Sequence, residues 1–343
     1  MDPVNRGYWN GQYNATNGPE KVELRRVLYD CLAEGERPIH FGELARLALY
    51  ASGIDKSSTI LDIGCGFPKD LGAWLSVGHQ GRLIGIDPNS AQFNGLPYTP
   101  LSTMPRSVKT AKTAGNPDKL TDFLTYMNYD QNIDYSHIDL YEASAHQLPL
   151  ADDSVDADQW LFSTYALDRD IQVPAFNEIR RVLKPSGRTL IASSGRENKS
   201  GIREYEAKIT DFLSSNTDHK FIAPVPVNAW NTSEDVQEQV LEDYRHVYVF
   251  RHHKDLVFDS LDRISKWRTS FWTLQDRYIA IEDGQKITPT NEQFEIALMA
   301  VLGYKIARSI KQGRPIKDIV RQDMFIASDS ELRILPVGFN QVK

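Results

Sequence analysis

Polar and apolar positions along the chain follow two alternating patterns, one typical of buried strands and the other of amphipathic helices. Compact apolar runs predict strands at 59–63, 82–87, 135–141, 159–162, 188–193, 246–250 and 323–327. Apolar residues at helical spacing predict helices at 19–34, 41–52, 71–75, 118–129, 174–183 and 202–214. Because strands and helices alternate, the sequence predicts an α/β fold with a doubly wound parallel sheet.

The same pattern contains no clean linker, so we expect one elaborated domain over residues 41–343 rather than two separate domains. Residues 1–40 precede it as an N-terminal helical segment. Their aromatic stretch Tyr8–Tyr13 is either a loose leader or a flap that closes over a ligand. A helix-rich and aromatic-rich block is predicted from Asp255 to Gln312.

Composition and charge narrow the class of protein. The chain has 343 residues, of which 41% are hydrophobic and 25% are charged, and its formal net charge is −7. An acidic total disfavours a surface that tracks nucleic-acid phosphates. Two cysteines give no disulfide framework, and no apolar run approaches the ~20 residues that span a bilayer. We therefore expect a cytoplasmic protein that acts on neither nucleic acid nor membrane, as a monomer or a homodimer.

The stretch LDIGCGFPKD, Leu61–Asp70, is a glycine-rich turn directly after a predicted strand. Gly64 and Gly66 let a ligand approach the backbone, and Asp87 ends the next strand, where it can accept hydrogen bonds from ribose hydroxyls. These features serve a dinucleotide and S-adenosylmethionine equally well. The third glycine of a dinucleotide turn is replaced by Lys69, and Asp62 would repel a pyrophosphate but suit a cation. The turn therefore disfavours a dinucleotide.

Two further segments accompany this turn in the expected order. Ser144–Asp156 reads SAHQLPLADDSVD, and Glu178–Gly187 reads EIRRVLKPSG. Together with Asp62–Gly66 and Asp87, they resemble the class I S-adenosylmethionine-dependent methyltransferases, in particular the small-molecule branch related to ubiquinone and menaquinone methyltransferases. The resemblance implies a Rossmann-like sheet that is mostly parallel with one antiparallel strand, and S-adenosylmethionine as the cofactor.

The resemblance also implies a set of cofactor-binding residues: Asp62, Gly64, Cys65, Gly66, Asp87, Pro88, Ser144, Ala145 and Ser163. Two positions depart from the family pattern. Pro68 stands where the family has a third glycine, and Ser144 stands where it often has an acid that binds the adenine amino group.

Relative to the family, the chain has insertions at about 96–132 and 251–320, which we expect to form a helical substrate cap. Trp267, Phe271, Trp272 and Tyr278 are candidate substrate-binding residues, although the helical spacing of Trp267 and Phe271 also fits a buried core helix. His146 and Tyr165 are candidate catalytic residues, with a surface histidine as the alternative for His146. No metal site is predicted.

The predicted function is transfer of a methyl group from S-adenosylmethionine to an O, N or C atom of a small-molecule acceptor, by in-line displacement. Two alternatives stay open: a catalytically silent methyltransferase-like binding scaffold, and an NAD-dependent oxidoreductase. The segment Leu161–Thr164 lacks the Asn/Asp-Pro-Pro-aromatic motif of adenine methyltransferases, and no Pro-Cys nucleophile is present. These absences favour a small-molecule acceptor.

Overall fold

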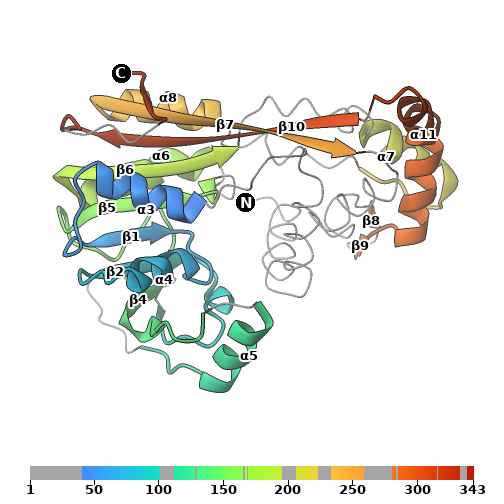
Figure 1. The fold of residues 1–343 in the computed structure, drawn as a ribbon. Helices are drawn as coiled ribbons and strands as arrows, with labels where there is room; N and C mark the ends of the chain where they lie inside the picture. The colour runs from blue at the N-terminus through green and yellow to red at the C-terminus, as the bar shows by residue number, and fades with distance from the viewer. Residues whose placement is uncertain are drawn as a thin grey trace. The chain divides into compact units, whose positions relative to one another are not determined.

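The computed structural model describes residues 41–100, 112–127, 130–164, 167, 169–194, 206–222, 233–258, 280–282, 285–314, 316–332 and 338–343 (Figure 1). The chain divides into two compact units. One comprises Ile39–Arg196, Trp230–His252 and Gln322–Lys343, and the other comprises Met1–Pro38, Glu197–Ala229 and His253–Arg321. The predicted N-terminal segment 1–40 lies outside the described residues. The prediction of one domain with two insertions stays a prediction.

A nine-stranded sheet forms the first unit's framework, in the order β11-β7-β10-β6-β5-β1-β2-β4-β3. Its strands are β1 (Ile60–Ile63), β2 (Leu83–Asp87), β3 (Thr99–Pro100), β4 (Ile138–Glu142), β5 (Val155–Leu161), β6 (Leu183–Ser194), β7 (His246–Phe258), β10 (Ile316–Ser328) and β11 (Asn340–Gln341). The strands from β6 to β3 pair in parallel, whereas β10 runs antiparallel to β6. The predicted fold class is therefore confirmed, and β11 adds a short antiparallel pairing with β7 that was not predicted.

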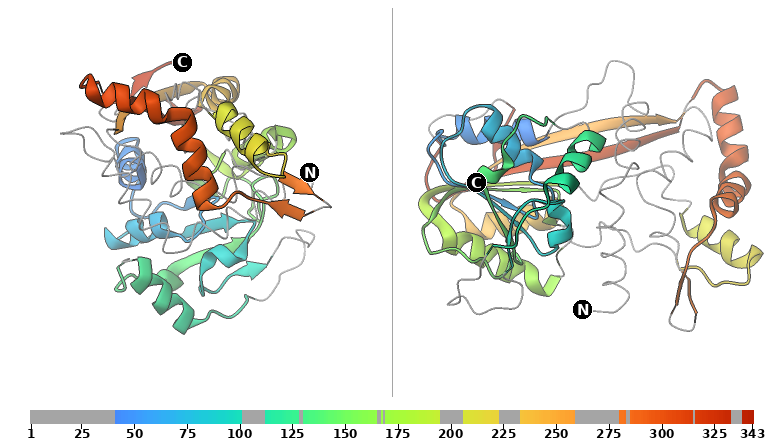
Figure 2. Two further views of the ribbon diagram at one scale, coloured as in Figure 1. Left: turned by 90° about the vertical axis from the view of Figure 1, so that its right-hand side faces the viewer. Right: turned by 90° about the horizontal axis from the view of Figure 1, so that it is seen from below.

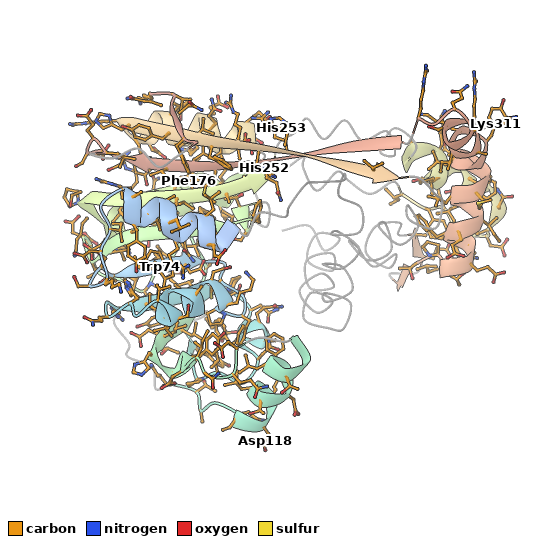
Figure 3. All side chains as sticks on the ribbon, in the orientation of Figure 1. Trp74, Asp118, Phe176, His252, His253 and Lys311 are labelled. Atoms are coloured by element: carbon orange, nitrogen blue, oxygen red, sulfur yellow. The ribbon has the colours of Figure 1, made fainter. Side chains whose placement is uncertain are left out.

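Helices cover both faces of the sheet in this unit (Figure 2). On one face, α3 (Phe41–Ala51), α4 (Lys69–Ser76) and α5 (Pro117–Met127) bury a core that includes Leu49 and Trp74. On the other face, α6 (Arg169–Val182) and α8 (Ser233–Asp243) bury a second core that includes Phe176 and Val240. Figure 3 labels Trp74 and Phe176 in these two layers. Because the central strands are covered on both sides, β1 and β2 are buried along their whole length, which explains their uninterrupted apolar sequence.

The structure differs locally from the sequence prediction at three places. The strand predicted from residue 135 begins only at Ile138, because Asp134 accepts a hydrogen bond from the Ser136 amide and starts a short 3₁₀ turn. Helix α8 was not predicted, although Ser233 begins it and acidic residues occupy its first turn. Strand β6 begins directly after α6, whereas the sequence prediction left residues 184–187 between the helix 174–183 and the strand 188–193.

The second unit contains α7 (Glu206–Asn216), the hairpin β8 (Ala280–Glu282) and β9 (Gln285–Ile287), and α11 (Asn291–Lys311). Helices α7 and α11 pack together, and their buried residues include Leu213, Phe294 and Leu302. The predicted helix-rich block is helical at α11, but it also contains the hairpin, which periodicity did not indicate.

Candidate active site

The glycine turn after β1 is shaped by two glycines with different roles. Both lie in the left-handed region, with φ of +67° at Gly64 and +52° at Gly66. A Cβ on Gly64 would come within 2.5 Å of Ser163 Oγ, whereas a Cβ on Gly66 would meet nothing within 4 Å. Gly64 is therefore required for close packing against the end of β5, and Gly66 borders open space that a ligand can enter.

Asp87, the last residue of β2, is held rigidly beside this turn. Its side chain is almost fully buried, its Oδ2 accepts a hydrogen bond from the Gly66 amide at 3.0 Å, and its Oδ1 accepts one from the Asn89 amide at 2.9 Å. Burial raises the Asp87 pKa to about 6, although the two amide bonds act in the opposite direction. Because a carboxylate oxygen can accept more than one hydrogen bond, each oxygen retains capacity for a ligand hydroxyl.

Asp62 is the second buried acid of the site. It pairs in register with Gln159 of β5, whose Oε1 accepts a hydrogen bond from Trp74 Nε1 at 3.3 Å. Burial raises the Asp62 pKa to about 8, with a further increase from the neighbouring Asp70, while Gln159 and Lys69 lower it. The carboxyl group is therefore mostly protonated at neutral pH, and a cation that entered the site would favour its ionised form.

The segment after β4 lies at the same edge of the sheet. The Ala143 amide donates to the Asp87 carbonyl at 3.1 Å, and the Gly64 amide donates to the Ile86 carbonyl at 2.8 Å. The carboxyl ends of β1, β2 and β4 are thus joined by backbone bonds, and Ser144 and Ala145 follow directly. His146, the catalytic candidate, is exposed, and its Nδ1 makes a 2.7 Å hydrogen bond with Ser144 Oγ.

Of the other predicted site residues, three lie within the described part of the chain and the remainder lie outside it. Ser163 donates to the Ile63 carbonyl at 2.8 Å, and Pro88 is exposed. Cys65 shares the turn, and burial raises the pKa of its thiol. The catalytic candidate Tyr165 and the substrate candidates Trp267, Phe271, Trp272 and Tyr278 lie outside the described residues. Within the described ranges, no group of three or more His, Cys, Asp or Glu side chains could hold a metal ion.

Aromatic packing links the first predicted insertion to the glycine turn, a contact that the sequence did not reveal. Phe67 of the turn packs against Phe123 of α5 at 4.7 Å between ring centroids and against Tyr135 at 5.0 Å. Phe123 falls within the predicted insertion 96–132. The insertion therefore supports the turn from the α4 side of the sheet. The sequence also assigned no role to Trp74 or Gln159, which are 85 positions apart, and it included Glu178 and Arg181 only as members of the segment Glu178–Gly187.

Comparison with known families agrees with this arrangement. Residues 61–191 match the sequence model of a family described as a methyltransferase domain, a segment that includes the glycine turn, Asp87 and the loop after β4. The sheet order, with β10 antiparallel beside β6, is that of the class I methyltransferase fold. Residues 61–191 are thus similar in sequence to a methyltransferase domain, and the fold around them is of the class I methyltransferase type.

Two solved structures that resemble the chain are distant from it in sequence. The YcgJ protein from Bacillus subtilis is 13% identical, with 85% of this chain and 100% of that chain covered and a TM-score of 0.46. The [4+2]-cyclase SpnF is 14% identical, with 94% and 96% covered and a TM-score of 0.46. With TM-scores below 0.5, these similarities support no conclusion about activity. No curated protein matches the chain. None of the helices that the structure describes is long and apolar enough to cross a membrane.

The family implies S-adenosylmethionine as the methyl donor, and the geometry of the turn fits this group. The open space beside Gly66 adjoins the buried Asp87 carboxylate, which suits a ribose. Asp62, two residues before Gly64, is a buried carboxyl group whose ionised form a cationic amino-acid end would favour. Both features suit a nucleoside joined to an amino acid, and neither requires a pyrophosphate.

Proposed function

We propose that the protein transfers the methyl group of S-adenosylmethionine to an O, N or C atom of a small-molecule acceptor. The observation that carries the cofactor assignment is the buried Asp87, whose two oxygens are oriented by the Gly66 and Asn89 amides next to an open turn. An acidic chain supports a small acceptor over a nucleic acid.

In this proposal, the residues of the turn bind and orient the cofactor, while the cofactor itself supplies the electrophilic methyl group. Asp87 accepts hydrogen bonds from the ribose, Asp62 interacts with the ammonium group, and Ser144 and Ala145 contact the adenine. Methyl transfer by in-line displacement depends mainly on holding the acceptor at near-attack distance. The predicted insertions would provide the acceptor walls, and the packing of Phe123 on Phe67 supports such a role for the first of them.

S-adenosylhomocysteine is expected to raise the melting temperature of the full-length protein, because a ligand that binds only the folded state stabilises it. At a concentration of 100 times its Kd, the gain in the free energy of unfolding is about 2.7 kcal/mol. Differential scanning fluorimetry measures the shift, with NADH as the matched control. A shift with NADH and none with S-adenosylhomocysteine would instead support the oxidoreductase alternative.

The size class of the acceptor can be tested with methyl-labelled S-adenosylmethionine and a cell extract. We expect label to appear in the dialysable fraction and to require the protein. Label confined to nucleic acid or protein would contradict a small-molecule acceptor. Binding of S-adenosylhomocysteine without any labelled product would support the silent scaffold.

Binding of S-adenosylhomocysteine should release close to one proton at about pH 7, because Asp62 ionises when it meets the ligand's ammonium group. Affinity should therefore rise with pH up to about 8, the pKa of Asp62 in the free protein. Calorimetry in buffers of different ionisation enthalpy measures the proton release. Asp62→Asn should abolish most of it, and an unchanged release in this variant would remove Asp62 from the binding site.

A further inference from the structure

Arg181, near the end of α6, uses all five of its N–H donors in hydrogen bonds. Its Nε and Nη2 donate to the two carboxylate oxygens of Glu178, each at 3.0 Å. Its Nη1 donates to the Leu150 carbonyl at 2.8 Å and to Asp152 at 2.5 Å, and Nη2 also donates to the Leu148 carbonyl at 3.1 Å. A guanidinium offers five donors in a fixed planar arrangement, so this site is saturated.

Glu178 completes the contact with the loop between β4 and β5. Its Oε2 accepts a hydrogen bond from the Leu148 amide at 2.9 Å, so both the amide and the carbonyl of Leu148 are bound by the Glu178–Arg181 pair. The pair is largely shielded from water, with side-chain exposures of 13% for Glu178 and 22% for Arg181. Shielded, charge-assisted hydrogen bonds are stronger than exposed ones.

These bonds fix one end of the turn 144–147, which carries the predicted adenine contacts. The other end is fixed by the Ala143 amide, which donates to the Asp87 carbonyl at 3.1 Å. Within the turn, the Gln147 amide donates to the Ser144 carbonyl at 3.0 Å. Residues 144–147 are therefore held between helix α6 and strand β2, which ends at Asp87.

We propose that Arg181, acting with Glu178, is a positioning residue for cofactor binding. It holds the turn 144–147 in its binding conformation, so that Ser144 and Ala145 do not have to become ordered when the adenine of the cofactor binds. This inference rests on the proposed function, because it requires that the turn contacts the cofactor. Preorganisation raises affinity by removing the entropy that binding would otherwise lose.

The test measures the Kd of S-adenosylhomocysteine by calorimetry, well below the melting temperature of each variant. Arg181→Gln should weaken binding by about 10- to 100-fold, because one or two backbone residues must then be ordered on binding. Arg181→Lys should weaken it by less, since lysine keeps the charge but loses the planar arrangement of donors. Glu178→Gln should also weaken binding, and it keeps the test available if Arg181→Gln does not fold.

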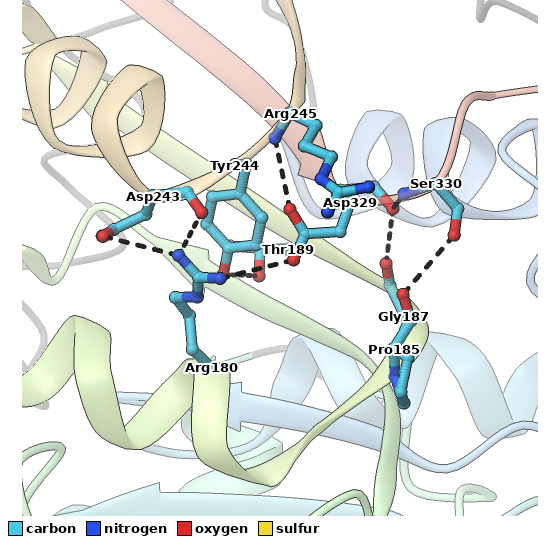
Figure 4. A network of polar contacts seen from close by, with 10 residues as sticks. Arg180, Pro185, Gly187, Thr189, Asp243, Tyr244, Arg245, Asp329 and Ser330 are labelled. Atoms are coloured by element: carbon cyan, nitrogen blue, oxygen red, sulfur yellow. Dashed lines mark hydrogen bonds and ion pairs between the residues drawn. The ribbon is translucent and has the colours of Figure 1, made fainter.

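Arg180→Gln is the matched control, because Arg180 is the adjacent arginine on α6 with partners elsewhere. It contacts Asp243 and Asp329, and its guanidinium lies 5.3 Å from the centre of the Tyr244 ring (Figure 4). This variant should change the Kd by no more than roughly twofold. Amide hydrogen exchange at Leu148 should accelerate in Arg181→Gln and not in Arg180→Gln.

Two outcomes would overturn the inference: one contradicts only the positioning role, and the other contradicts the proposed function as well. If the unaltered protein binds S-adenosylhomocysteine and Arg181→Gln binds it equally well while melting at a lower temperature, the contact is only structural. If the unaltered protein does not bind S-adenosylhomocysteine, the proposed function fails and the positioning role fails with it.

Discussion

Replacement of Asp158 by asparagine is expected to raise the free energy of unfolding above about pH 8 by about 5 kcal/mol relative to the unaltered protein. Asp158 is fully buried in β5, and burial raises its pKa to about 8. Its Oδ2 accepts a hydrogen bond from Thr189 Oγ1 at 2.8 Å, while its Oδ1 has no hydrogen-bond partner in the described part of the chain. Thr189 is in turn bonded to the Tyr244 hydroxyl at 2.7 Å (Figure 4).

The sign follows from proton binding. Between about pH 4 and about pH 8 the folded protein keeps the Asp158 proton that the unfolded chain has lost, so stability falls as the pH rises. The asparagine side chain of the variant would resemble the protonated acid and would still accept the Thr189 hydrogen bond, so this loss should be absent from the variant. Below about pH 4, where both states of the acid are protonated, the two proteins should be similarly stable.

Urea denaturation from about pH 5 to about pH 9 measures the effect as a difference in slope. The buried Asp62 and Asp87, whose pKa values are also raised, contribute a dependence of the same sign to both proteins. The difference between the two profiles therefore isolates Asp158. Parallel profiles would show that Asp158 titrates near its ordinary pKa in the folded protein.

Asp87→Asn is expected to weaken binding of S-adenosylhomocysteine by about 10- to 100-fold, because the variant loses charge-assisted hydrogen bonds to the ribose. In the unaltered protein each Asp87 oxygen accepts a hydrogen bond from one backbone amide, Gly66 or Asn89. The asparagine side chain has a single oxygen, so it can accept a bond from only one of these two amides. The variant thus also disturbs the orientation of the glycine turn.

Asp139→Asn is the control for this experiment. Asp139 is a carboxylate of the neighbouring β4, but it pairs with Arg82 at 2.8 Å and Lys112 at 3.1 Å. Calorimetry should give the unaltered Kd for this variant. Equal affinity of Asp87→Asn and the unaltered protein would show that Asp87 orders the turn without contacting the cofactor.

The fold class and the position of the glycine turn could be predicted because both depend on local patterns. Buried parallel strands are continuous apolar runs, so β1 and β2 were predicted to within one residue at each end. The left-handed conformation at Gly64 and Gly66 depends on residue type, and a glycine pair between a strand and a helix signals it. Asp158 directly precedes the predicted strand 159–162, and neither its burial nor its raised pKa could be inferred from that position.

The tertiary structure alone decided which side chains meet across the chain. Arg181 and the carbonyl of Leu148 are 33 positions apart, and Trp74 and Gln159 are 85 positions apart. No local period encodes such contacts, because they depend on the register of neighbouring strands and on which face each helix covers. The sequence by itself therefore determined the fold class and the residues of the glycine turn. Packing decided how those residues are oriented and how strongly they hold their protons.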